Sequence, residues 1–310
     1  MLQEVYRLPW IDLPIYGFGL MLVIGFLAAA QLARYLANRH GLNGELFVNA
    51  ALLALLVGVA GARLSHILEN LRDFTNPQLS IGENFWNMLD LRSGGLTYYG
   101  GFLLAFPTLL LYARWKQIPL RPAMDIAAPC LMIALGFGRI GCFLNGCCHG
   151  AECDLPWAVR FPYLSNAYVD QEIQTPEDLM TIDARTGQRR PLTIREVRNQ
   201  PALLHMAHAQ RSHPVHPAQL YSSFNAFFIS AVLLAFLTLR HPPGRVFALM
   251  LMLYGTSRFI LETLRTEPAR FGTHLSISML ISLFIVPLGV AMWLIFGRMA
   301  RTEAARPLKA

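Results

Sequence analysis

The chain has 310 residues, of which 54% are hydrophobic and only 15% are charged, and its mean hydropathy is +0.40. An average soluble domain carries about 25% charged residues, so this composition argues against a soluble protein and predicts an all-α polytopic membrane protein. The net charge of +7 is explained by membrane topology and by attraction to anionic lipid headgroups, and it gives no reason to expect nucleic acid as a partner.

Seven apolar segments approach the length of about 20 residues that a helix needs to cross a bilayer. They are residues 14–36, 46–68, 95–113, 124–147, 217–239, 246–264 and 275–296. Prolines and acids at the N-terminus replace the basic region of a signal peptide, so the first segment is predicted to be a retained span.

Arginine and lysine in the short connections predict the orientation of these spans. With the N-terminus outside, 11 basic residues lie in the inside connections and 5 in the outside ones. The prediction is a single membrane-embedded domain, residues 1–310, with a basic cytoplasmic tail at 298–310.

Residues 151–215, between helices four and five, are predicted to form a small outward-facing irregular or β head, in which "LMTIDARTGQRRPLTI" favours a hairpin. The amphipathic segment 69–93 is predicted to be a short surface helix or loop.

Three arginines, Arg63, Arg139 and Arg258, fall within the predicted spans. A charged side chain at the centre of a membrane helix costs about 2.5 to 3.5 kcal/mol on insertion scales, so each is a functional candidate. The alternative is that Arg63 and Arg139 extend from helix ends to the interface. Arg258, Glu262 and Arg265 share one helical face; because Glu262 compensates at most one of the two arginines, the remaining positive charge favours an anion.

Glycines surround two of the candidate sites. "GFGRIG", at residues 136–141, matches a dinucleotide pattern, but it lies within a predicted span rather than after a strand, so a nucleotide site is rejected. The glycines there predict a close approach of another backbone or of a lipid headgroup. "SGGLTYYGGF", residues 93–102, frames Tyr98 and Tyr99, for which an interfacial aromatic belt and a site are both open interpretations.

Cysteines cluster after Arg139, at Cys142, Cys147, Cys148 and Cys153. The sequence has no C-x-x-C pair there, and the vicinal Cys147 and Cys148 are not expected to face one tetrahedral zinc ion. No metal is therefore predicted, and a disulfide stays open.

The motif "GRIGCFLNGCCHG" resembles the signature of the prolipoprotein diacylglyceryl transferases, which Arg139, Asn145, Gly146 and Gly150 match. Further stretches resemble this family in the same order along the chain: "YGFGLMLVIGFLAA", "SGGLTYYGGF", "PWAVRFP", "HPAQLYSS" and "GTSRFILETLR". The resemblance covers nearly the whole chain.

The resemblance implies an enzyme of the bacterial cytoplasmic (inner) membrane that moves a diacylglyceryl group from phosphatidylglycerol to the lipobox cysteine of a prolipoprotein signal peptide, releasing glycerol 1-phosphate, with no cofactor. Four residues are then expected to be catalytic, Arg139, Arg258, Tyr99 and Glu262. The residues expected to bind phosphatidylglycerol are Arg139, Asn145, Gly146, Gly150, Arg63, Arg265, Gly100, Gly101, His216, Gln219 and Tyr221.

This chain departs from the family pattern at several polar positions. Tyr99 replaces a common histidine, Cys142 an asparagine, Phe18 a tyrosine and Ser222 an acid. A tyrosine, with a pKa near about 10, is a poor base unless its environment perturbs it. Two alternatives follow: a paralogue that binds phosphatidylglycerol or a lipopeptide without catalysis, and a lipid transporter.

Overall fold

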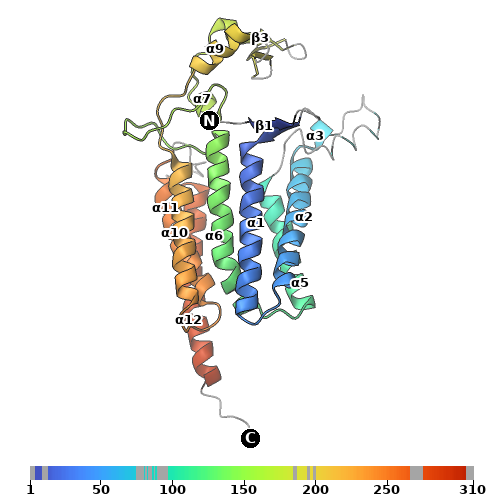
Figure 1. Ribbon diagram of the computed structural model, residues 1–310, viewed down its shortest axis with the longest axis vertical. Coiled ribbons are helices and arrows are strands. Elements are labelled where there is room, and N and C mark those ends of the chain that lie inside the picture. The colour runs from blue at the N-terminus through green and yellow to red at the C-terminus, as the bar shows by residue number, and fades with distance from the viewer. Residues whose placement is uncertain are drawn as a thin grey trace. The chain divides into compact units, whose positions relative to one another are not determined.

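Helices make up most of the structure, a computed structural model that describes residues 4–8, 13–74, 80, 82, 86, 88, 97–183, 187–193, 196–197, 200–265 and 275–304 (Figure 1). A long helix lies at each of the seven predicted segments. These helices are α1 (Gly17–Arg39), α2 (Gly44–Glu69), α5 (Tyr98–Trp115), α6 (Leu120–Asn145), α10 (Ala218–Leu237), α11 (Arg245–Glu262) and α12 (Ile277–Ala304).

Five helices of the described chain are long and apolar enough to cross a membrane: α1, α2, α6, α10 and α12. The other two, α5 and α11, are 18 residues long and are not among these five. Helix α11 carries Arg245, Arg258 and Glu262, and α5 contains three tyrosines, two glycines and Arg114. Helix α12 continues through Ala304, so the helix includes the first half of the predicted tail.

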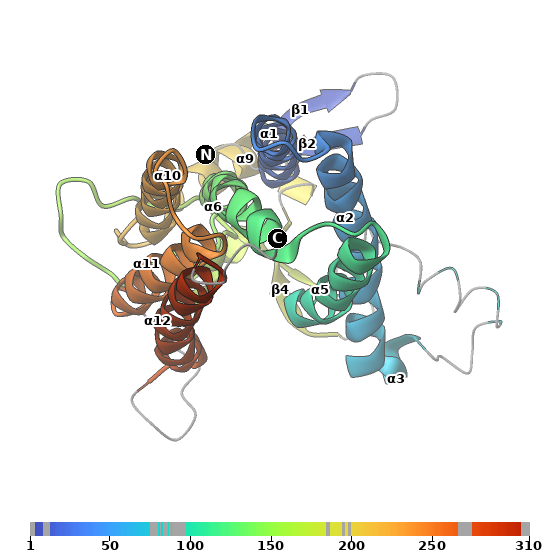
Figure 2. The ribbon, with the colours of Figure 1, turned by 90° about the horizontal axis from the view of Figure 1, so that it is seen from below.

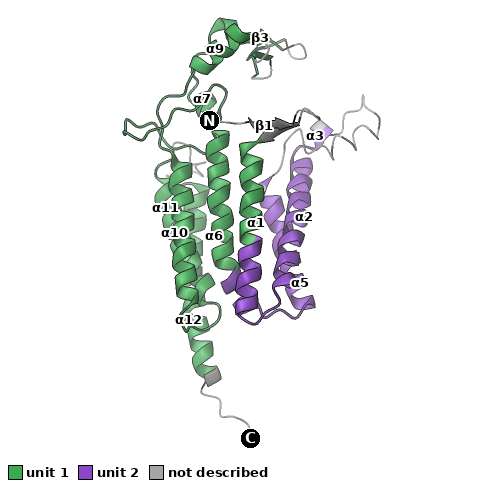
Figure 3. Ribbon diagram, in the orientation of Figure 1, with its two compact units in different colours: residues 1–29, 127–310 green, residues 30–126 purple. Residues whose placement is uncertain are grey.

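The chain divides into two compact units (Figure 3). Unit 1 comprises residues 1–29 and 127–310, and unit 2 comprises residues 30–126. Each unit is held together by its own helix pairs, which lie side by side in Figure 2: α10, α11 and α12 in unit 1, and α2 with α5 in unit 2.

In unit 2, glycines bring α2 and α5 into close contact. A Cβ added to Gly61 would lie 2.6 Å from the carbonyl oxygen of Gly100, and one added to Gly101 would lie 2.9 Å from that of Gly58. Small residues allow two apolar helices to approach until their backbones touch, which replaces the hydrophobic driving force that lipid does not supply.

In unit 1, side-chain hydrogen bonds connect three helices. Ser223 and Ser230 of α10 donate to the carbonyl oxygens of Gly136 and Pro129 of α6, both at 2.9 Å. Asn225 of α10 donates to Ser257 of α11 at 2.8 Å. The faces of α6, α10 and α11 that carry these residues are therefore turned toward one another.

The head has its own small core. Its hairpin pairs β3 (Met180–Ile182) with β4 (Arg189–Pro191), so the predicted hairpin is confirmed, although the turn residues 184–186 lie outside the described chain. The prediction of an irregular or β head was incomplete, because the head also contains α7 (Asn166–Asp170), η2 (Glu177–Leu179) and α9 (Pro201–Ala209). These elements form because they bury one apolar cluster: Tyr163, Tyr168, Leu179, Val197 and Ala207.

Two further short elements lie outside the seven helices. The strands β1 (Glu4–Leu8) and β2 (Leu13–Tyr16) form an antiparallel hairpin that the sequence analysis did not predict. Helix α3 (Leu71–Phe74) is the described part of the predicted surface helix in 69–93; most of the rest of that segment lies outside the described residues.

Candidate functional site

Arg258, Glu262 and Arg265 lie together at the C-terminal end of α11, as their spacing predicted. Nη1 of Arg258 lies 2.8 Å from Oε2 of Glu262, and Nη1 of Arg265 lies 3.7 Å from the same oxygen. The carboxylate is buried, with a side chain only 4% exposed. One buried carboxylate therefore faces two guanidinium groups, and one positive charge is left over.

Two serines at the start of α12 complete this network. The hydroxyl of Ser276 donates to Oε1 of Glu262 at 3.1 Å and accepts a hydrogen bond from the backbone N–H of Met279 at 3.1 Å, so it also caps α12. Nη2 of Arg258 donates to Ser278 at 2.9 Å. The guanidinium of Arg258 is thereby fixed from two sides, which preorganises its charge.

Arg139 lies in the last two turns of α6 and is partly buried. Among the described residues, no carboxylate lies within ion-pair distance of its guanidinium, and its charge acts repulsively on Arg258. The helix ends six residues later in a Schellman motif: Gly146 has φ +73°, and the N–H of Cys147 donates to the carbonyl of Cys142 at 3.1 Å. Arg139 is thus a guanidinium held near a helix end without a compensating acid in the described part of the chain.

Gly150 joins the ends of three helices. Its N–H donates to the carbonyl of His216 at 3.0 Å, and the N–H of Ala151 donates to the carbonyl of Leu264 at 2.9 Å. A Cβ at Gly150 would lie 2.6 Å from Cβ of His216 and 2.9 Å from the Leu264 carbonyl oxygen. Glycine is needed here so that the loop after α6 can lie against the start of α10 and the end of α11.

The beginning of α10 contributes three of the predicted residues. Nε2 of Gln219 donates to the carbonyl of Cys147 at 2.7 Å, while its buried Oε1 has no hydrogen-bond partner among the described residues. Trp157 donates through Nε1 to the hydroxyl of Tyr221 at 2.7 Å, and Nδ1 of His216 lies 3.4 Å from that hydroxyl. The structure thus brings His216, Gln219 and Tyr221 to the loop that carries Gly146 and Gly150.

Asn145 is the last residue of α6, whereas four predicted residues, Arg63, Tyr99, Gly100 and Gly101, belong to unit 2. Arg63 is 5% exposed, donates through Nε to the carbonyl of Met88 at 2.8 Å and lies over the ring of Phe74 at 5.2 Å. Tyr99 is exposed on the first turn of α5. Gly100 and Gly101 pack against α2, and a Cβ at Gly100 would overlap the side chain of Ser65. The contacts that Gly100, Gly101 and Arg63 make in the structure are therefore local packing contacts within unit 2.

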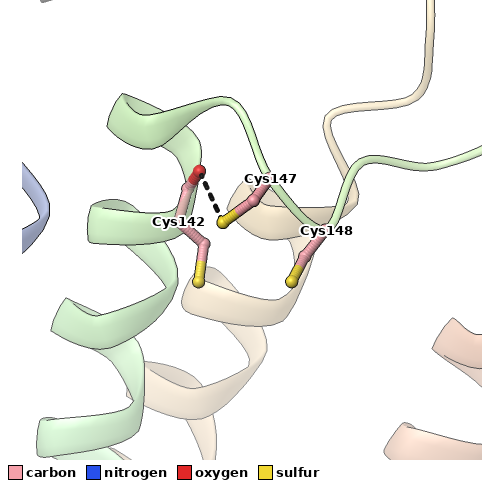
Figure 4. Close-up of side chains that lie close together, drawn as sticks. All are labelled: Cys142, Cys147 and Cys148. Atoms are coloured by element: carbon pink, nitrogen blue, oxygen red, sulfur yellow. Dashed lines mark hydrogen bonds between the residues drawn. The ribbon is translucent and has the colours of Figure 1, made fainter. Parts of the chain in front are cut away.

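Three of the cysteines converge (Figure 4). The Sγ atoms of Cys142, Cys147 and Cys148 all lie within 4.8 Å of one another, and Sγ of Cys147 contacts the carbonyl of Cys142 at 3.7 Å. The sulfurs of the vicinal Cys147 and Cys148 thus lie in one group, contrary to the geometry expected from their adjacency, and Cys148 has a left-handed backbone with φ +58°.

Sequence reasoning missed Ser276, Ser278 and Trp157 as members of this network. A serine immediately before an apolar helix is a recognisable cap, so Ser276 carried a signal for its place at the helix start. The hydrogen bonds from these side chains to Glu262, Arg258 and Tyr221 depend on tertiary packing and leave no local pattern.

The similarity to known proteins extends over nearly the whole chain. Residues 6–295 match the model of the family described as prolipoprotein diacylglyceryl transferase. A phosphatidylglycerol–prolipoprotein diacylglyceryl transferase of Clostridium tetani is 29% identical over 279 residues, covering 90% of this chain and 92% of the relative. One of Corynebacterium efficiens is 28% identical over 288 residues (92% and 79%), and one of Rhodopirellula baltica is 34% identical over 162 residues (52% and 32%).

Proposed function

This chain belongs to the prolipoprotein diacylglyceryl transferase family, and from this premise we propose that its arginine cluster positions phosphatidylglycerol for transfer of the diacylglyceryl group to a prolipoprotein thiol. The protein is a transferase of lipoprotein biosynthesis and a multi-pass membrane protein. The acceptor in this proposal is the lipobox cysteine of a signal peptide, and the membrane is the bacterial inner membrane.

The reaction defines what the site must do. The thiolate sulfur of the acceptor attacks the glyceryl carbon that bears the phosphate ester, a C–S bond forms, the C–O bond breaks, and glycerol 1-phosphate leaves with the bonding electrons. Negative charge therefore grows on the ester oxygen that leaves. Fixed cations in a dry pocket stabilise such charge more than they stabilise the bound lipid, which lowers the barrier.

The observation that carries this proposal is the charge imbalance at the end of α11. Arg258 and Arg265 share the single carboxylate of Glu262, and Arg139 has no acid partner among the described residues. Guanidinium groups bind phosphate oxygens in a bidentate manner. In this assignment Arg139 and Arg258 contact the phosphate, Arg265 adds positive potential, and Glu262 positions Arg258 without touching the lipid.

The loop after α6 and the start of α10 supply the polar surroundings of the headgroup in this proposal. Oε1 of Gln219 is a buried acceptor with no partner in the described ranges of the chain, and in this proposal it accepts a hydrogen bond from a hydroxyl of the glycerol headgroup. The other headgroup-binding residues of this proposal are Asn145, Gly146, Gly150, His216 and Tyr221, all of unit 1. For Arg63, Gly100 and Gly101, a headgroup-binding role stays a prediction from the resemblance.

The proton of the acceptor thiol needs a base, and two residues are candidates for this role. Tyr99 occupies the position at which the family commonly has a histidine. His216 has one ring nitrogen, Nδ1, near the hydroxyl of Tyr221, while Nε2 has no partner among the described residues. If the Tyr221 oxygen accepts from both Trp157 and His216, Nε2 is left as a proton acceptor. We favour His216 on this geometry.

For the topology we propose seven spans with the N-terminus outside. Helices α5 and α11 then also cross the membrane. Helix α11 carries three charged residues, Arg245, Arg258 and Glu262, of which the last two belong to the proposed site. The bias of arginine and lysine toward the predicted inside connections supports this orientation.

A transfer assay tests the proposed function. Purified protein is mixed with phosphatidylglycerol labelled in its acyl chains and with a peptide that carries a lipobox cysteine; a peptide with serine at that position is the control. We expect label on the cysteine peptide only, together with released glycerol phosphate. Lipid binding without transfer would instead support the non-catalytic paralogue, and movement of the lipid between leaflets without transfer would support the transporter.

A further inference from the structure

The cysteine cluster at the end of α6 has no role in the proposed transfer, yet its three thiols face one another. Cys142 lies in the last turn of α6, and Cys147 and Cys148 follow the Schellman motif that ends it. This turn directs the chain back along the helix end, so that the three sulfurs approach within 4.8 Å of one another (Figure 4).

We propose that Cys142, Cys147 and Cys148 bind one soft, thiophilic metal ion of the Cu(I) class through three thiolates. A metal–sulfur distance of about 2.3 Å places three trigonal thiolates roughly 4 Å apart. The observed spacing needs only small side-chain rotations to reach this geometry. Thiolates are the ligands that soft ions such as Cu(I) prefer over harder ions.

The ligand count favours a three-coordinate ion over structural zinc. No fourth histidine, cysteine or carboxylate joins the group among the described residues. His149 is adjacent in sequence, but its ring is engaged elsewhere: Nδ1 lies 2.9 Å from the carbonyl of Gly150, and Nε2 lies 3.1 Å from Asp170. A closed tetrahedral zinc site needs four protein ligands, whereas Cu(I) is satisfied by three thiolates.

Positive charge lies beside the cluster, because the charges of Arg265 and Arg139 act on Cys148. Without them the end of a helix would disfavour anions, because the macrodipole places partial negative charge there. A complex of Cu(I) with three thiolates is negatively charged, and these two arginines compensate it.

A regulatory consequence follows, and this part rests on the proposed function. Arg139 and Arg265 are also assigned to the anionic lipid, so a negative metal–thiolate complex beside them competes for the same positive potential. Metal binding is therefore expected to inhibit transfer by lowering kcat/KM for phosphatidylglycerol.

Binding is tested on the full chain in detergent, reduced and free of oxygen, by titration with Cu(I) buffered by a coloured chelator. We expect one equivalent to bind to the wild type and to Cys153→Ser, the matched control outside the cluster. Affinity should fall at least tenfold in Cys142→Ser and at least a hundredfold when all three cysteines of the cluster are changed to serine. Binding to that triple variant as tight as to the wild type would overturn the proposal, and so would no binding to the reduced wild type.

X-ray absorption at the copper edge of the loaded wild type provides a second readout that needs no variant. Three sulfur neighbours would support the site even if a serine variant failed to fold, whereas nitrogen or oxygen neighbours would refute it. Because neither measurement uses transfer activity, failure of the metal site and failure of the proposed function are distinguishable. Copper that binds through three sulfurs but leaves kcat/KM unchanged would contradict only the regulatory consequence.

Discussion

Arg258 and Glu262 are one turn apart on α11, and the guanidinium nitrogen Nη1 lies 2.8 Å from the carboxylate oxygen Oε2. The same oxygen lies 3.7 Å from Arg265. Because two arginines share one carboxylate, the C-terminal end of α11 carries an excess of fixed positive charge. A lone ion pair would be neutral, whereas Arg258, Glu262 and Arg265 together carry one net positive charge.

We expect Arg139→Ala to lower the rate of transfer by about 10²- to 10³-fold, the usual loss when one preorganised donor is removed from a site of developing charge. Arg240→Ala is the control, because Arg240 is exposed just beyond the opposite end of α10. The rates are measured with labelled phosphatidylglycerol. Near-wild-type activity of Arg139→Ala would remove this residue from the mechanism.

Glu262→Gln should lower kcat by roughly 100-fold, because the guanidinium of Arg258 loses its anchor and small displacements in a site have effects of that size. The KM for phosphatidylglycerol should stay constant or fall, since the arginines lose a competing anion. Steady-state kinetics separate the two parameters. A rise in KM with kcat intact would argue that Glu262 contacts the lipid rather than positions Arg258.

Gly150→Ala should destabilise the protein by about 1 to 3 kcal/mol, the usual cost of overpacking, because the new Cβ would overlap His216 and the carbonyl of Leu264. The matched control is Gly138→Ala on α6, where the nearest atom to a new Cβ is 4.0 Å away. Thermal unfolding in detergent compares the two variants. Equal unfolding temperatures would show that the junction at Gly150 is looser than its geometry indicates.

In unit 2, Gly100→Ala should lower the unfolding temperature while Gly58→Ala leaves it nearly unchanged. The first Cβ would overlap Ser65 between α5 and α2, whereas the second would meet only Ala105 at 3.9 Å. If Gly100 contributes only to lipid binding, Gly100→Ala would instead lose transfer activity at an unchanged unfolding temperature. Measuring both quantities on both variants decides between packing and lipid binding.

Substitution distinguishes the two candidate bases. If His216 accepts the thiol proton, His216→Gln should lower the rate of transfer by about 10²- to 10⁴-fold, the usual contribution of a positioned general base, while Tyr99→Phe keeps a rate near that of the wild type. The rates are measured with labelled phosphatidylglycerol. A slow Tyr99→Phe beside an active His216→Gln would assign the proton transfer to the tyrosine.

Much of the architecture and one part of the site follow from local sequence. Helix positions were predictable because about 20 apolar residues in a row have no other way to satisfy their backbone in a bilayer. The grouping of Arg258, Glu262 and Arg265 followed from the helical repeat alone. The head was predicted less well, because the short helices α7 and α9 form through burial around Tyr163 and Tyr168 and have no strong period of their own.

Tertiary structure decided which distant residues meet. His216, Leu264 and Gly150 are brought together by backbone hydrogen bonds between three segments far apart in the chain, and Ser276 reaches Glu262 only because α12 packs against α11. The convergence of Cys142, Cys147 and Cys148 depends on the backbone angles after α6, which the letters "CFLNGCC" do not reveal. Hydropathy and helical period act within one element and can be read from sequence, whereas contacts between elements depend on how whole surfaces pack.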